Sequence, residues 1–123
     1  MRIIITPIFI ILAALAKAIM DTLQFHFEDS VFSEMGKWWN PELSWKLKWA
    51  ACCLGEKESF PFSSTLFVSV TDAWHMFQSI EITLIFLALV FYRNFFKKWW
   101  QDFILFRIIF TGSFQLFFYL FTN

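Results

Sequence analysis

Two aspartates and two histidines are the side chains in this sequence best suited to hold a metal ion. Asp21 and His26 close one apolar segment, and Asp72 and His75 lie in the next one. If the two segments are antiparallel helices, both pairs reach the same membrane boundary. Carboxylate and imidazole groups there would suit a divalent metal such as zinc or iron, and His26 with His75 could instead hold a haem. A hydrogen-bonded cluster that only fixes helix packing asks less of the same residues.

Further polar side chains repeat at helical spacing inside apolar segments: Lys17, Asp21 and Gln24; Asp72, His75, Gln78 and Glu81; Arg107, Thr111 and Gln115. The first and third sets each follow one helical face, whereas a spacing of three carries the second set gradually around its helix. Ionisable groups in hydrocarbon cost roughly 2.5–3.5 kcal/mol each, so their presence indicates a function. The sequence therefore predicts an intramembrane polar network of Lys17, Gln24, Gln78, Glu81, Arg107 and Gln115.

The segments that must position these residues are unusually apolar. Of the 123 residues, 59% are hydrophobic and 23% are aromatic, which is more than a soluble domain of this size carries. About 20 apolar residues cross a bilayer as a helix. We predict one all-α integral membrane domain over residues 1–123, with transmembrane helices at about 3–25, 66–92 and 103–121. The formal net charge of zero argues against a nucleic-acid partner.

The segment 26–61, which we call the Trp-rich segment, differs from the three apolar segments, because it holds four of the seven tryptophans and four lysines. Asn40 and Pro41 are typical of a helix start, and the leucines and alanine that follow repeat on one helical face. Trp and Lys together favour a helix at the membrane surface, although the alternation Trp45-Lys46-Leu47-Lys48-Trp49 also fits a short strand. Cys52 and Cys53 are interpreted as two small apolar residues.

Basic residues predict the orientation of the chain. The short turn from Arg93 to Lys98 and the single Arg2 would both stay in the cytoplasm. This places the N-terminus in the cytoplasm and both segment 26–61 and the C-terminus outside, although the four lysines of that segment oppose the assignment. The apolar run continues past Ala14-Leu15-Ala16, so we expect an uncleaved helix rather than a signal peptide.

Two stretches of sequence carry a resemblance to a known group of proteins: Trp39-Asn40-Pro41-Glu42-Leu43-Ser44-Trp45-Lys46 with Lys48-Trp49, and Ser64-Thr65 followed by Thr71-Asp72-Ala73-Trp74-His75. With the helix end at Asp21–His26, they resemble a group of small uncharacterised bacterial integral membrane proteins, over about residues 15–92. The resemblance implies a bacterial inner-membrane location. It also implies that the Trp-rich segment and the Asp72–His75 turn form one functional unit, and it implies no activity.

Three functions fit these patterns. The first is an accessory or structural subunit of a larger membrane complex, whose partners are lipid and either other subunits or a second copy. The second is a membrane enzyme or redox protein with a divalent metal at Asp21, His26, Asp72 and His75. The third is a transporter or proton path through Lys17, Glu81 and Arg107, which would need an oligomer. The first requires no cofactor and asks least of the residues.

Overall fold

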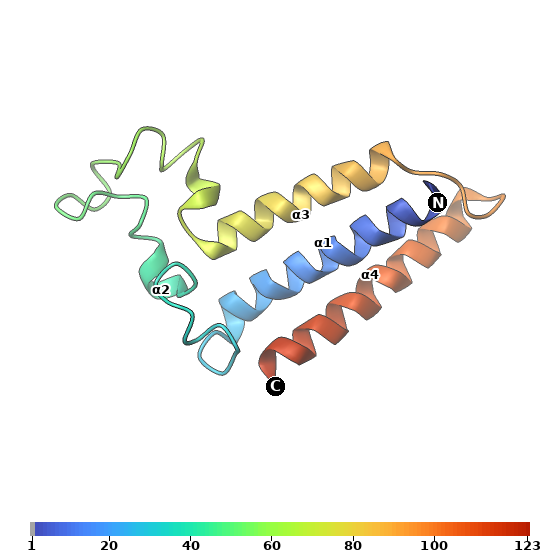
Figure 1. Ribbon diagram of the computed structural model, residues 1–123, viewed down its shortest axis with the longest axis horizontal. Coiled ribbons are helices and arrows are strands. Elements are labelled where there is room, and N and C mark those ends of the chain that lie inside the picture. The colour runs from blue at the N-terminus through green and yellow to red at the C-terminus, as the bar shows by residue number, and fades with distance from the viewer. Residues whose placement is uncertain (1) are drawn as a thin grey trace.

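The computed structural model describes residues 2–123, and within them the regular elements are all helical (Figure 1). Three helices are long: α1 (Arg2–Phe25), α3 (Ala73–Val90) and α4 (Trp99–Thr122). Between α1 and α3 lie the one-turn helix α2 (Pro41–Ser44) and the 3-10 turn η1 (Val68–Val70). All three long helices are long and apolar enough to cross a membrane, so the predicted all-α class with three spans is confirmed.

The bounds of the second and third spans differ from the predicted ones. Residues 66–72 lie outside α3, because Asp72 adopts an extended conformation and caps the helix with its side chain. The third helix begins at Trp99, four residues earlier than predicted, after the extended Lys98. Lys97 and Lys98 therefore stay in the turn, and two tryptophans open the span at the depth where indole rings prefer to lie.

Helix α1 lies between α3 and α4 and packs against both (Figure 1). Its contact faces carry small side chains, of which Ala13, Ala14, Ala16 and Ala18 are almost fully buried. Small residues let helix backbones approach closely, which is how helices associate in lipid without a hydrophobic driving force. The central position of α1 follows from these alanines.

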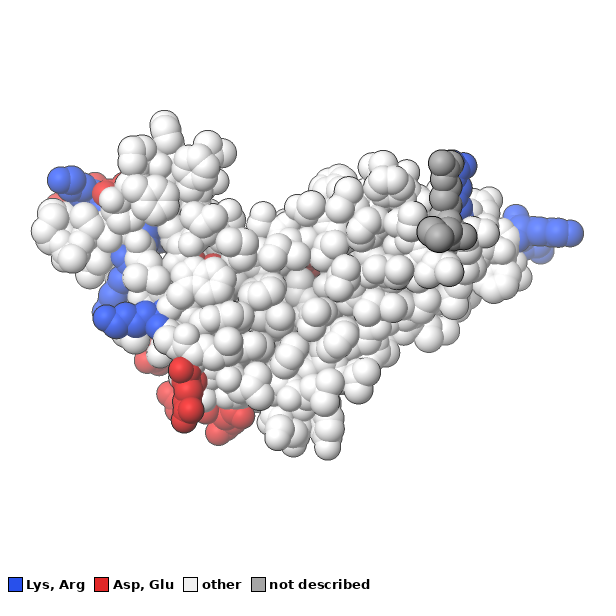
Figure 2. All heavy atoms as spheres, in the orientation of Figure 1, with Lys and Arg blue, Asp and Glu red and all other residues white. Residues whose placement is uncertain are grey.

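The two ends of the bundle differ in charge. We call the end with the start of α1 and the turn 91–98 the basic end, and the opposite end, with residues 26–72, the Trp-rich end. Lysine and arginine mark the basic end, whereas basic and acidic side chains mix at the Trp-rich end (Figure 2). The middle of the face shown is almost free of charged atoms, as a lipid-facing surface requires.

The Trp-rich segment is mostly irregular. Asn40 caps α2 as predicted, since its side chain accepts a hydrogen bond of 2.9 Å from the amide of Glu42. The prediction of a longer surface helix after Pro41 is wrong, because α2 ends at Ser44. The chain then turns back on itself, and the only trace of the alternative strand is an isolated bridge between Trp49 and Glu58 in the described chain. Cys52 and Cys53, interpreted as small apolar residues, form a vicinal disulfide in this turn.

Aromatic and backbone contacts fasten the Trp-rich segment to the helices. The indole of Trp38 donates to the carbonyl of Val70 (3.1 Å), and the carbonyl of Trp38 accepts from the amide of Ala73 (3.0 Å). Phe32 is buried and stacks on Trp39 with 5.0 Å between ring centroids. The segment thereby covers the ends of all three helices, because Phe32 also contacts Phe121 and belongs to one core cluster with Leu23.

The carboxylate of Glu58 organises the turn that leads to α3, so the structure of this turn should depend on pH. Glu58 accepts from the hydroxyl and amide of Ser64 and from the amide of Phe62. The Ser64 hydroxyl, followed by the two amides, holds the pKa of Glu58 below its usual range. A lowered pKa favours the folded turn above about pH 4.3, the ordinary glutamate value, and this stabilisation is lost as the pH falls through the lowered pKa.

We expect amide exchange at Phe62 and Ser64, corrected for its intrinsic pH dependence, to lose protection as the pH falls below about 4.3. Phe62 has a φ of 64°, which a phenylalanine rarely adopts, so the turn needs contacts such as those of Glu58 to hold this conformation. Glu58→Gln should remove this pH dependence, whereas Glu56→Gln, an exposed neighbour, should leave it unchanged. Protection that is equal across this range in the unsubstituted protein would contradict the assigned role of Glu58.

Candidate functional site

Asp72 and His75 form the tightest polar pair at the Trp-rich end. Asp72 is only 3% exposed and caps α3: one oxygen accepts from the amide of His75 at 2.9 Å. The other oxygen lies 2.6 Å from the Nδ1 atom of the His75 ring. With a proton on Nδ1, the Nε2 atom is a free acceptor, which is the arrangement of a general base. One aspartate thus starts the helix and orients the imidazole.

This pair opens onto a hollow of about 340 Å³ that the Trp-rich segment shares. Its lining comes from the end of α1, from α2 and from the start of α3: Gln24, Pro41, Ser44, Trp45, Asp72, Trp74 and His75. Ser44 is buried in this wall. The two stretches of sequence that carry the resemblance therefore meet in one place, through this hollow and through the hydrogen bonds of Trp38.

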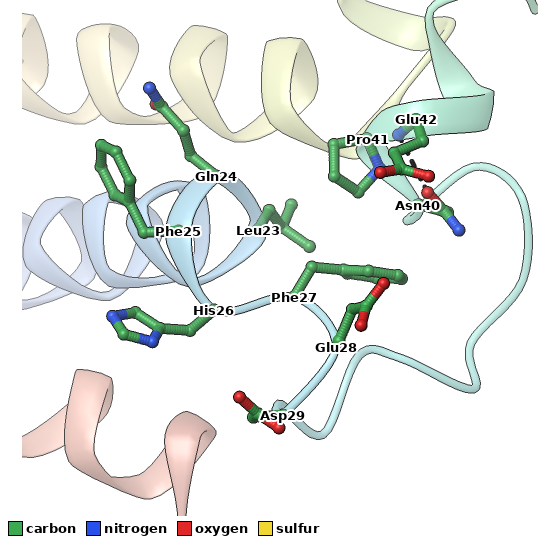
Figure 3. Close-up of a pocket in the computed structure, with 10 residues that line it drawn as sticks. All are labelled: Leu23, Gln24, Phe25, His26, Phe27, Glu28, Asp29, Asn40, Pro41 and Glu42. Carbon is green, nitrogen blue, oxygen red and sulfur yellow. Dashed lines mark hydrogen bonds between the residues drawn. The ribbon is translucent and has the colours of Figure 1, made fainter.

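His26 lies in a different place, beside a larger hollow of about 530 Å³ (Figure 3). Its ring points toward α4, where it packs edge-on against Phe118 with 5.3 Å between ring centroids, while Gln24 points toward α3. Acidic side chains from two segments also line this hollow, namely Glu28, Asp29 and Glu42. His26 therefore faces away from the Asp72–His75 pair.

The structure does not bring the four predicted metal ligands into one cluster. In residues 2–123 no group of three or more His, Cys, Asp or Glu side chains could hold a metal ion together. Asp21 is instead bound to Lys17, with 2.7 Å between Nζ and Oδ1. The four residues do lie toward the same end of the bundle, but helix rotation separates them: α1 ends at Phe25, and His26 follows five residues after Asp21, about 140° around the helix axis.

A polar groove of about 310 Å³ runs between α1 and α4; we call it the α4 groove. It contains the Lys17–Asp21 ion pair on one side and the predicted polar stripe of α4 on the other. Two phenylalanines complete its wall, so the lining consists of Lys17, Asp21, Arg107, Phe110, Thr111, Phe114 and Gln115. The spacing of four in α4 thus directs its polar side chains to the charged pair of α1.

The remaining members of the predicted network lie elsewhere. Glu81 is half-buried on α3 and interacts electrostatically with Lys17 and Asp21 across the contact between α1 and α3. Gln78 is half-buried one turn earlier on α3, and Gln24 lies at the Trp-rich end. Two cations and two anions therefore follow one another across the bundle, from Glu81 through Lys17 and Asp21 to Arg107, and their formal charges cancel.

Asp102, which no sequence pattern singled out, is 1% exposed at the basic end. Its carboxylate accepts from the hydroxyl of Tyr92 (2.5 Å) and from the amides of Phe95 (3.1 Å) and Phe96 (2.9 Å). Asp102 thereby closes the turn between α3 and α4. The available signal was an acidic residue directly before the predicted span 103–121, at the end where a negative charge suits the helix dipole.

Two arrangements are thus candidates for function: the α4 groove, which can bind a polar group of another helix, and the Asp72–His75 pair, which can move a proton. No protein-family model matches the chain, and no curated protein or solved structure is significantly similar to it. The function is therefore inferred from these two arrangements.

Substitutions at Asp72 separate its capping role from its role toward His75. Asp72→Ala removes the helix cap and should cost about 1 kcal/mol of stability, measured by thermal denaturation in detergent followed by circular dichroism. Asp72→Asn keeps a capping oxygen, so its stability should stay close to that of the unsubstituted protein, while the NMR signals of the His75 ring should move because the carboxylate beside Nδ1 becomes an amide. Asp29→Ala, at an exposed position, is the control. Equal destabilisation by both Asp72 substitutions would contradict the capping role.

Proposed function

We propose that this protein is an accessory or structural subunit of a larger membrane protein complex, and that it binds a transmembrane helix of another protein through the α4 groove. The supporting observation is Arg107. Its side chain is exposed, and it forms no ion pair with any residue of the described chain. Arg107 follows Trp99 by eight residues, which places it about 12 Å along a helix of about 36 Å. A free arginine at that depth is costly in lipid.

The packing of α4 agrees with an unfilled contact. Helix α4 packs against α1, and none of its most apolar 18-residue stretch is buried. Thr111 and Gln115 are exposed along the same stripe as Arg107. Lipid tails cannot accept hydrogen bonds from these groups, so a neighbouring helix with polar side chains is the partner that suits them.

The charges define the chemistry of that partner. Lys17 is already bound to Asp21, which leaves Arg107 as the cation of the groove without an anion in the described chain. A carboxylate on the partner helix, at the depth of Arg107, would complete the pair. A side-chain amide or a hydroxyl would suit Thr111 and Gln115 one and two turns further along.

The test is purification of the tagged protein from native membranes at native expression level, with the co-purifying proteins quantified by mass spectrometry. We expect a stoichiometric membrane protein. Arg107→Ala should weaken its recovery by about fivefold to thirtyfold, since polar contacts between membrane helices contribute about 1–2 kcal/mol. Ile108→Ala, at an exposed apolar position outside the groove lining, should have no such effect. Recovery of this chain alone, or only of a second tagged copy, would overturn the proposal.

The second candidate is a membrane enzyme at the Trp-rich end, and the geometry of Asp72 and His75 favours it. The oriented imidazole and the buried Ser44 line one hollow, as acid–base chemistry requires. Asp72 and His75 supply two ligands, so a divalent metal there would take others from a partner or from water. For this candidate, His75→Gln should abolish the enzymatic activity of the purified protein. The same substitution should leave the recovery of a co-purifying membrane protein unchanged, which distinguishes this candidate from the first.

We also propose that the basic end faces the cytoplasm of a bacterial cell, with the N-terminus inside and the C-terminus outside the inner membrane. The basic residues of the short turn 91–98 support this orientation, because such turns stay in the cytoplasm. The disulfide between Cys52 and Cys53 at the other end also supports it, because disulfides persist in oxidising compartments. The bacterial source rests on the sequence resemblance alone.

A protease-cleavable tag after Asn123 tests this orientation in intact spheroplasts. External protease should remove this tag and should spare a matched tag placed before Met1, because only the C-terminus would be exposed outside. Permeabilised cells, in which both tags should be cleaved, provide the control for accessibility. Removal of the N-terminal tag alone from intact spheroplasts would show the opposite orientation.

A further inference from the structure

A hollow of about 300 Å³ lies at the basic end, where the end of α3 and the start of α4 meet α1. Its wall is almost entirely apolar, and most of it comes from Thr6, Ile10, Ala88, Leu89, Phe103 and Phe106. The carboxylate of Asp102 is also in the wall, but three donors already occupy it. A hydrocarbon chain suits such a surface, since it needs no hydrogen bonds from the wall.

The hydroxyl of Thr6 is the exception in this wall. Thr6 is only 3% exposed, and its oxygen has no hydrogen-bond partner in the described chain. A buried hydroxyl without a partner costs free energy, so native structures rarely leave one. By contrast, the hydroxyl of Thr22 in α1 donates to the carbonyl of Ala18, and that of Thr83 in α3 donates to the carbonyl of Ser79, each at 2.8 Å. Thr6 therefore marks a place for a ligand oxygen that accepts a hydrogen bond.

Positive charge borders this hollow. Arg93, Lys97 and Lys98 belong to the turn that closes the same end, all three are exposed, and none forms an ion pair with a described residue. Arg93 follows Tyr92, which lines the apolar hollow, and itself lines a second hollow of about 370 Å³ between the start of α1 and the end of α3. With Asp102 included, the turn and the first residues of α4 carry a formal net charge of +2. An anionic group just outside the apolar hollow is favoured there.

We propose that the basic end binds an anionic phospholipid of the adjoining leaflet. An acyl chain fills the apolar hollow, an ester carbonyl accepts the hydrogen bond of Thr6, and the phosphate lies among Arg93, Lys97 and Lys98. The position of Thr6 along α1 supports this arrangement of acyl chain, ester and phosphate. Thr6 is only four residues, about 6 Å, from the start of α1, which is close to the level of the ester groups. The site is separate from the α4 groove, so it does not depend on the proposed subunit function.

Native mass spectrometry of the full-length protein in mild detergent tests this site. The probes are phosphatidylglycerol and phosphatidylcholine with identical acyl chains, titrated separately. We expect phosphatidylglycerol to bind at least about tenfold more tightly, since each basic residue near an anionic headgroup contributes appreciably. Replacing Arg93, Lys97 and Lys98 by Gln should remove this preference. Replacing Lys46, Lys48 and Lys57 by Gln, which removes equal charge at the Trp-rich end, should leave it unchanged.

The hollow itself is tested by changing Thr6. Thr6→Val keeps the shape of the side chain but removes the hydroxyl. This substitution should weaken the binding of both lipids about fivefold. Thr6→Ser should bind both lipids almost as well as the unsubstituted protein does. Thr83→Val, which removes a hydroxyl already bonded within α3, is the matched control.

Three outcomes would overturn the proposal. Equal binding of the two lipids would remove the role of the basic turn. Unchanged binding in Thr6→Val would remove the role of the hollow, whatever the headgroup preference. Displacement of bound phosphatidylglycerol by an uncharged carbonyl amphiphile, such as a membrane quinone, would assign the hollow to a different ligand.

Discussion

Close contact of α3 and α4 with the alanine faces of α1 is the interaction on which the rest of the structure depends. Hydrocarbon offers no hydrophobic force to join helices, so their association relies on close packing and on polar contacts. The buried alanines between residues 13 and 18 provide the close packing. The ion pair of Lys17 with Asp21, on the same stretch of helix, provides the polar contacts. Because α1 is central, its ion pair meets Glu81 on one side and the α4 groove on the other.

The ends of the bundle are ordered by single acidic residues that satisfy several donors. Asp72 starts α3 and orients His75, while Asp102 closes the turn before α4. Glu58 has the same role in the Trp-rich segment, where little regular structure exists. Each carboxylate replaces water as the acceptor for backbone amides that would otherwise be left without a partner. The loops are thus fixed by side chains rather than by secondary structure.

The surfaces left open are those where a three-helix arrangement cannot satisfy its own polar groups. Arg107 forms no ion pair with a described residue, and the hydroxyl of Thr6 has no hydrogen-bond partner there. Both line hollows, of which the one midway along α4 is polar and the one at the basic end is almost entirely apolar. A membrane supplies two kinds of neighbour, a partner helix and a lipid. The α4 groove lies midway along the bundle and is polar, as a contact with another helix requires. The hollow at the basic end is apolar and lies near positive charge, as a contact with an anionic lipid requires.

The sequence by itself determined the three spans, the cap at Asn40 and the polar stripe of α4, because each depends on local composition or on the helical period. It also placed Asp72 beside His75, since a spacing of three makes neighbours on a helix. Only the tertiary structure decided that His26 faces Phe118 rather than His75, and that Asp102 closes the turn. Hydropathy sets the depth of a residue but not the rotation of its helix, and rotation is fixed by the packing around α1.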